Sequence, residues 1–95
     1  MPNIGSTLGL CKKAGKIVTG FDAVIADIRN AAGVLITSDL SDKTKKEVTF
    51  HCTKHNRKLV EIDHTMEDIQ SVLGRKTGII AVLDSGLFAS LTKNY

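Results

Sequence analysis

The segment that follows residue 18 has the most regular pattern of apolar positions in the chain. Its apolar residues recur at the spacing of one helix face: Phe21, Val24, Ile25 and Ile28. Thr19 stands three residues before Asp22, the spacing of a capping-box pair, so we predict that a helix begins at Thr19. The sequence "NAAG" then ends this helix.

Two more helices are predicted from end signals that flank apolar patterns. Ser6 is placed to cap a helix that runs to about Ala14 and ends at Gly15. Ser41 is placed in the same way to cap a helix that reaches about His55.

The last third of the chain contains two further predicted helices. Thr65 and Asp68 repeat the capping spacing, and Gly74 closes the helix that they begin. One face of that helix is apolar: Met66, Ile69, Val72 and Leu73. A short final helix is predicted over residues 85–94.

Short apolar segments between these helices have the composition of strands. They are a brief strand within "KIVTG", the run "VLITS", the segment "KLVEID" and the run "IIAVLD". Continuous apolar runs bounded by turn residues are typical of strands buried on both faces. Strands that alternate with helices predict an α/β fold with helices on both faces of one sheet, and 95 residues correspond to one domain.

Composition changes this picture only modestly. The chain has 13 Lys and Arg residues against 10 Asp and Glu residues, a net charge of +3. This excess permits a polyanionic partner without requiring one. Aromatic residues make up 4% of the chain, so we expect an aliphatic core and no aromatic surface that stacks several bases.

Neither a membrane nor an export route is indicated. No apolar run approaches the roughly 20 residues that cross a bilayer, and the segment "MPNIGSTLGLCKK" lacks the basic region of a signal peptide. We therefore expect a cytoplasmic protein without a membrane partner, in which Cys11 and Cys52 are reduced thiols.

The segment "FHCTKH" raises a metal site as an alternative. On a helix His51 and His55 are i, i+4 neighbours, and Cys52 lies three residues from His55. Zinc would need further ligands, however, and Val48, Cys52 and His55 follow the spacing of a core-facing side. Because no Cys-x-x-Cys or nucleophile elbow is present either, we expect buried structural thiols, no metal, no cofactor and no catalysis.

Three connections are predicted to converge at one end of the sheet. They are the segment from Lys16 to Asp22, the turn over residues 38–41 and the loop over residues 75–78. The first two combine helix N-termini with hydroxyl side chains, and backbone N–H groups there can hold phosphates. The third is basic. This favours nucleic-acid binding over a protein-interaction module, with plain solvated lysines as a further alternative.

Two phrases of the sequence carry a family resemblance. The pattern L-G-L-x-x-x-A-G-K-x-x-x-G spans Leu8 to Gly20, and S-D-x-S-x-x-T-x-K spans Ser38 to Lys46. With the late segment "LGRKTGIIAVLDSGLF", the likeness covers nearly the whole chain. The chain thus resembles the ribosomal-protein family of L-seven-Ae and L-thirty-e type, and most closely its bacterial YlxQ-type branch.

This resemblance implies both a fold and a function. The fold is a three-layer α-β-α sandwich with a small mixed four-stranded sheet. Proteins of the family bind RNA, typically a kink-turn, which is a sharply bent helix–internal-loop–helix. The N-terminal end of the second helix enters the bent groove, and the late loop helps to hold a splayed-out base, in line with the general reading of RNA at unstacked bases.

Carried over position by position, the resemblance identifies candidate RNA-binding residues. Gly20 precedes the reading helix, and Lys16 and Thr19 lie in the turn before it. Asp22 stands where typical members contact sheared G·A pairs, whereas Phe21 at the neighbouring position cannot do so by hydrogen bonding.

The remaining positions match the family unevenly. Ala26 stands where the family usually has a lysine, and Arg29 lies about one turn further along. The turn and the late loop complete the expected site: Ser38, Asp39, Arg75, Lys76 and Thr77.

We therefore expect a monomeric, ribosome-associated protein that recognises a structured RNA such as a kink-turn. It would do so through the N-terminus of its second helix and the loop before its last strand. The alternative is a protein-interaction module of the same fold that has lost specific RNA recognition, which Phe21 and Ala26 favour.

Overall fold

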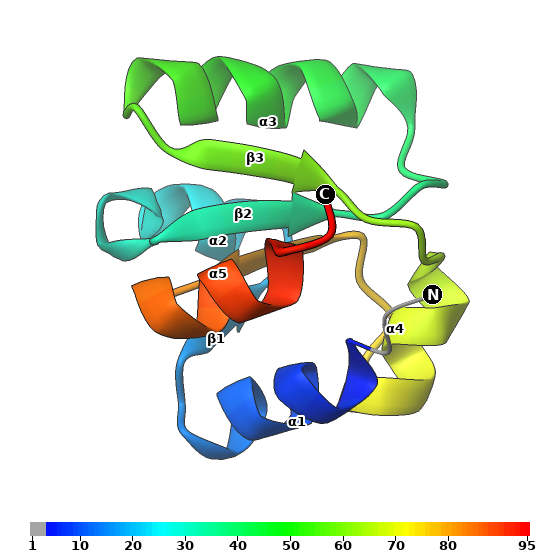
Figure 1. The fold of residues 1–95 in the computed structure, drawn as a ribbon. Coiled ribbons are helices and arrows are strands. Elements are labelled where there is room, and N and C mark those ends of the chain that lie inside the picture. Colours follow the sequence, from blue (N-terminus) through cyan, green and yellow to red (C-terminus); the bar gives the residue numbers. More distant parts are fainter. Residues whose placement is uncertain (1–3) are drawn as a thin grey trace.

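A four-stranded sheet lies between two groups of helices in the computed structural model, which describes residues 4–95 (Figure 1). The first three residues of the N-terminal segment, considered above for an export signal, lie outside the described residues. The elements are, in chain order, α1 (Gly5–Lys13), β1 (Ile17–Thr19), α2 (Phe21–Ala26), the 3-10 helix η1 (Ile28–Asn30), β2 (Gly33–Ile36), α3 (Asp42–Lys54), β3 (Lys58–Glu61), α4 (Met66–Leu73), β4 (Ile79–Val82) and α5 (Ser85–Thr92).

The sheet is mixed, with the strand order β1-β4-β2-β3. Strand β4 pairs antiparallel with both β1 and β2, whereas β3 pairs parallel with β2. The two central strands, β2 and β4, are buried along their whole length, as expected for strands covered on both faces. The prediction of an α/β fold with a mixed sheet and helices on both faces is confirmed.

Alternate residues of the central strands build two separate apolar clusters. Leu35 and Ile80 pack with helices α1, α4 and α5, while Val34 and Ala81 pack with α2 and α3. In Figure 1, α5 passes in front of the strands and α2 lies behind them. Because successive side chains of a strand point to opposite faces, this two-sided burial produces the three-layer α-β-α sandwich.

Several helix ends agree with the predicted signals. The Ser41 hydroxyl accepts a hydrogen bond from the N–H of Thr44 at the start of α3. Thr65 and Asp68 form a complete capping box at the start of α4, which Gly74 ends with a φ of 74°. Gly15 ends α1 with a φ of 67°. Local side-chain chemistry therefore sets these boundaries.

Three local predictions are corrected by the structure. Ser6 lies inside α1, whose N-cap is Ile4, so it caps nothing. Thr19 belongs to β1, and the N-cap of α2 is Gly20 without a side-chain cap. Helix α2 also ends early, at Ala26, and continues as the 3-10 turn η1. The cause at Thr19 is tertiary, because its pairing with Ile80 extends the strand ladder to that residue.

Within residues 4–95, none of the helices has the length and apolar character that a bilayer span requires.

Candidate nucleic-acid interface

The connection between β1 and α2 is a single residue, Gly20. Its backbone adopts φ 91° and ψ 150°, a conformation that is open almost only to glycine. Its N–H donates to the carbonyl oxygen of Ile79 at 3.1 Å, so the strand ladder holds the turn directly. Helix α2 therefore begins at a fixed point at the edge of the sheet, beside the first residue of β4.

The loop before β4 and the turn after β2 meet at this same end of the sheet. The N–H of Thr37 donates to the carbonyl oxygen of Gly78 at 3.0 Å. A β-carbon on Gly78 would lie 2.8 Å from the Leu40 side chain, so the loop and the turn are in close contact. The structure thus brings together the start of α2, the turn after β2 and the loop before β4, as predicted, but not Lys16, the first residue of the predicted α2 connection.

The late loop presents its two cations at this end. The Arg75 guanidinium donates a hydrogen bond to the Thr19 hydroxyl at 3.3 Å, which links the loop to β1. Lys76 is exposed beside it. Thr77, by contrast, is buried, and its hydroxyl exchanges hydrogen bonds with the backbone of Ile79. Thr77 therefore shapes the loop, while Arg75 and Lys76 provide its positive surface.

Ser38 and Asp39, predicted as RNA contacts, hold the neighbouring loop in place. Both the N–H and the hydroxyl of Ser38 donate to the carbonyl oxygen of His64, at 3.0 and 3.2 Å. The Asp39 carboxylate accepts a hydrogen bond from the N–H of Met66, the first residue of α4, at 3.1 Å. Both residues are also exposed, so a ligand in solution can reach them.

Helix α2 is divided between a packed and an open side. Val24 is completely buried in the cluster shared with α3. Asp22, Ala23 and Ala26 are exposed, and Phe21 is half-buried. The open side of α2 thus carries one carboxylate and two methyl groups, and it has no cation at position 26.

Two predicted site residues lie at the opposite end of the sheet. Lys16 precedes β1, and its carbonyl oxygen accepts from the N–H of Leu83, just after β4. Arg29 lies in η1, and its carbonyl oxygen accepts from the guanidinium of Arg57 at 2.8 Å. Strand β4 separates Leu83 from Ile79, so Lys16 lies at the end of the sheet away from Gly20. Arg57 precedes β3, whose first residue Lys58 pairs with Gly33 opposite Val82, so Arg29 lies at that same far end.

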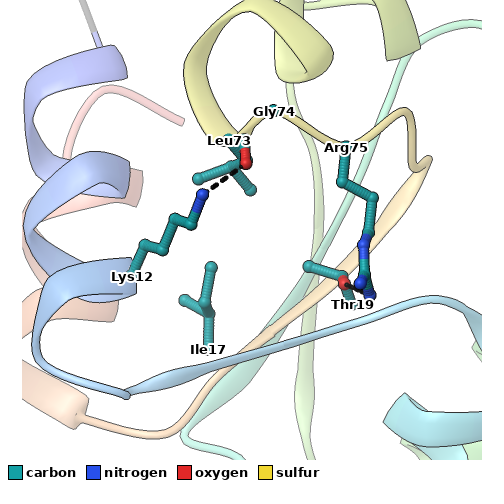
Figure 2. Close-up of a pocket in the computed structure, with 6 residues that line it drawn as sticks. All are labelled: Lys12, Ile17, Thr19, Leu73, Gly74 and Arg75. Carbon is teal, nitrogen blue, oxygen red and sulfur yellow. Dashed lines mark hydrogen bonds between the residues drawn. The ribbon is translucent and has the colours of Figure 1, made fainter.

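A hollow of about 330 Å³ adjoins the late loop, between α1, β1 and the end of α4 (Figure 2). Lys12 reaches across it and donates to the carbonyl oxygen of Leu73 at 2.7 Å, while Arg75 borders the other side. Ile17 contributes an apolar wall. Lys12 was not among the predicted site residues, although it belongs to a local run of lysines in the sequence.

The thiols are enclosed in the two apolar clusters. Cys11 and Cys52 are buried and unpaired, and they lie on opposite faces of the sheet. Burial raises the pKa of both thiols, and the charge of Asp84 raises that of Cys11 further. A raised pKa disfavours the reactive thiolate. The expectation that both thiols are buried is therefore confirmed.

Within residues 4–95, no group of three or more His, Cys, Asp or Glu side chains is placed to hold a metal ion. Cys52 lies in the core, and the His51 ring is in edge contact with two phenylalanine rings, Phe21 and Phe50.

Two curated proteins of known name are similar in sequence to this chain. The RNA-binding protein YlxQ of Bacillus subtilis is 38% identical over 86 residues, which cover 83% of this chain and 81% of that protein. The RNA-binding protein YlxQ of Enterococcus faecium is 35% identical over 88 residues, covering 90% of this chain and 84% of that protein. No protein-family model matches the chain.

A solved structure has the same fold. It is that of a protein of unknown function from Bacillus halodurans, with a TM-score of 0.86, 21% sequence identity, and coverage of 98% of this chain and 96% of that one. At this identity the likeness concerns the fold alone. The sequence relatives decide the family, because they match most of both chains. On these grounds, the chain belongs to the YlxQ-type branch of the L-seven-Ae family.

Proposed function

We propose that the protein binds a structured RNA, such as a kink-turn, at the end of the sheet where Gly20 lies. The observation that carries this proposal is the convergence there of the start of α2, the turn after β2 and the loop before β4. The names of the two relatives, which are RNA-binding proteins, point in the same direction. RNA is read largely by shape and at unstacked bases, for which a rigid surface of several short connections is suitable.

Each connection has a physical role in this proposal. Gly20 allows the RNA backbone to approach the first turn of α2 without a side chain in the way, because no atom outside Gly20 and its two chain neighbours lies within 4 Å of the β-carbon position. Arg75 and Lys76 supply positive charge for phosphates. Asp22 is exposed in the first turn of α2, where its carboxylate can accept hydrogen bonds from bases.

Lys16 and Arg29 lie away from the proposed RNA-binding end of the sheet. Since their backbones lie at the other end of the sheet, they would meet only an RNA that extends along the molecule. Ribosome association follows from the same proposal if the recognised RNA is ribosomal.

Position 26 offers the sharpest test of the site. Replacing the exposed Ala26 with lysine adds a cation to the open side of α2. If RNA lies there, Ala26→Lys should tighten binding to a kink-turn RNA and steepen its salt dependence by about one unit of slope. Ala89→Lys is the matched control, because Ala89 is an exposed helical alanine on α5. Equal effects of the two variants would contradict the proposed site.

Removal of the loop cations gives the complementary test. Arg75→Ala combined with Lys76→Ala should weaken binding to the kink-turn RNA and reduce the salt slope by up to about two units. Lys58→Ala with Lys93→Ala removes the same charge from exposed positions elsewhere and serves as the control. Unchanged affinity in the loop variant would remove the late loop from the site. Equal, weak binding of wild-type protein to a kink-turn and a straight duplex would instead favour the protein-interaction alternative.

A further inference from the structure

The outer surface of α3 carries an aromatic ring between two lysines. Lys46, Phe50 and Lys54 follow one another at intervals of four residues, so they lie in one row along the helix. All three side chains are exposed, and Phe50 retains 63% of its surface. A phenylalanine with this exposure contributes little to the core.

This row is connected to the candidate interface through other rings. The Phe50 ring lies edge-on to the His51 ring, with centroids 5.3 Å apart. The His51 ring in turn lies edge-on to Phe21, with centroids 6.3 Å apart. Phe21 is the first residue of α2 and directly follows Gly20. The aromatic rings thus form a continuous path from the start of α2 to the surface of α3.

Within residues 4–95, neither lysine of the row forms an ion pair with a carboxylate. In the part of the chain that the structure describes, the ion pair of α3 joins Lys45 to Glu61 at 2.9 Å, and it involves neither Lys46 nor Lys54. Towards the end of α3 the surroundings are cationic. Desolvation lowers the pKa of His55, and the charges of Arg29, Lys54, His51 and Arg57 lower it further.

We propose that Phe50 stacks on an unpaired nucleotide of the bound RNA, while Lys46 and Lys54 contact the phosphates on either side of it. This inference rests on the proposed function, which it extends from the start of α2 onto α3. Two lysines eight residues apart are separated by about 12 Å along a helix axis, and the ring lies midway between them. Aromatic rings flanked by cations are the usual platform for single-stranded nucleic acid.

The surface is suited to RNA rather than to an apolar protein partner. The other large apolar side chains that are exposed within residues 4–95 are Leu10, Val72 and Tyr95, and none of them is on α3. A lone ring between two lysines therefore forms no apolar patch. Two exposed carboxylates lie near Lys46: Asp42, one turn earlier in the same row, and Glu47 on the neighbouring row. Lys54 has no acidic residue within four positions of it on α3, so the end of the row is cationic.

The test compares three RNAs: a kink-turn with blunt ends, the same kink-turn with a six-uridine extension, and the uridine oligomer alone. Phe50→Ala should weaken binding to the second and third RNAs by about tenfold and leave the first unchanged. Phe50→Tyr should behave like wild type, because it keeps a ring. Leu10→Ala is the control, since it removes an equally exposed apolar side chain from α1.

Two further measurements give readouts that a loss of folding alone would not produce. Lys46→Ala with Lys54→Ala should reduce the salt slope for the uridine oligomer by about 1.4, the value for two single-strand contacts. Phe50→Trp introduces the only tryptophan of the chain, and its emission should be quenched when the oligomer stacks on it.

The outcomes separate this inference from the proposed function. If wild-type protein binds the blunt kink-turn, but Phe50→Ala binds all three RNAs like wild type, the proposed role of the α3 surface is wrong and the proposed function stands. If the oligomer binds through Phe50 but the kink-turn does not bind, the proposed recognition of a kink-turn is wrong and the proposed role of the α3 surface stands. Absence of binding to all three RNAs by wild-type protein overturns both.

Discussion

The carboxylate of Asp39 accepts a hydrogen bond from the backbone N–H of Met66 at 3.1 Å, across 27 positions of the chain. Asp39 thus supports the start of α4 as well as lying at the candidate interface. Asp39→Ala should lower the free energy of unfolding by about 1 kcal/mol, through the loss of one helix-start hydrogen bond. Asp39→Asn should lose less, because its amide oxygen still accepts. Urea unfolding of both variants measures the difference, and equal stability of Asp39→Ala and wild type would contradict it.

Gly20 should be intolerant of any side chain. Gly20→Ala meets no steric contact, but it forces an alanine into a conformation that costs about 1–3 kcal/mol. Gly9→Ala is the matched control: Gly9 lies within α1 with open space around it, so the alanine should stabilise the protein by about 0.5–1 kcal/mol. Thermal or urea unfolding should show opposite signs for the two variants. The same sign for both would disprove this account of the β1–α2 turn.

Gly33 and Phe88 should be energetically coupled. A β-carbon on Gly33 would lie 2.2 Å from the Phe88 ring, and Phe88 is only 5% exposed, so the ring has little room to move away. Gly33→Ala should cost about 1–3 kcal/mol through overpacking. The double variant with Phe88→Leu should lose less unfolding free energy than the sum of the losses in the two single variants. Additive effects in a double-mutant cycle would show that the ring escapes the clash by moving.

Acid should weaken the start of α4 through Asp68. The backbone N–H of Thr65 donates to the Asp68 carboxylate at 2.9 Å, and this hydrogen bond lowers the pKa of Asp68. A lowered pKa means that the stabilisation is complete above the ordinary value of 3.8 and is lost as the pH falls through the lowered value. The stability difference between wild type and Asp68→Asn should therefore shrink between about pH 5 and pH 2.

The control for this experiment is Glu67→Gln, which removes one negative charge from the same helix turn. Urea unfolding across the pH range measures both differences. A constant difference for Asp68→Asn would show that the capping box does not respond to acid.

The local features of the fold could be predicted because they depend on near neighbours in the sequence. Ser41 and Thr65 cap helices through residues three positions away, and that spacing is visible in the sequence. Thr19 has the same spacing to Asp22, yet its hydroxyl accepts from Arg75, 56 positions away. Strand pairing and the distant Arg75 determine that Thr19 ends a strand and does not cap a helix. Neither interaction follows from local spacing.

The candidate site could be predicted only in part, because much of it depends on strand pairing between distant segments. The convergence of the three connections depends on the direction of β4, which runs antiparallel to β1 and β2 and therefore begins at the end of the sheet where they finish. The alternation of strands and helices does not reveal this direction, because it favours a parallel sheet. The position of Lys16 likewise depends on which end of β1 faces Leu83, and that pairing is set by the strand order. The row of Lys46, Phe50 and Lys54 was visible as a spacing of four, but its exposure depends on which side of α3 packs on the sheet.

The division of α2 into a packed and an open side has a consequence for ligand preference. Val24 anchors the helix from within the core, and Gly20 fixes where it begins. Asp22, Ala23 and Ala26 touch solvent, so they can be exchanged without moving either anchor. Under the proposed function, ligand preference should depend on these three positions, and a combinatorial library there should yield variants with altered RNA preference on an unchanged scaffold.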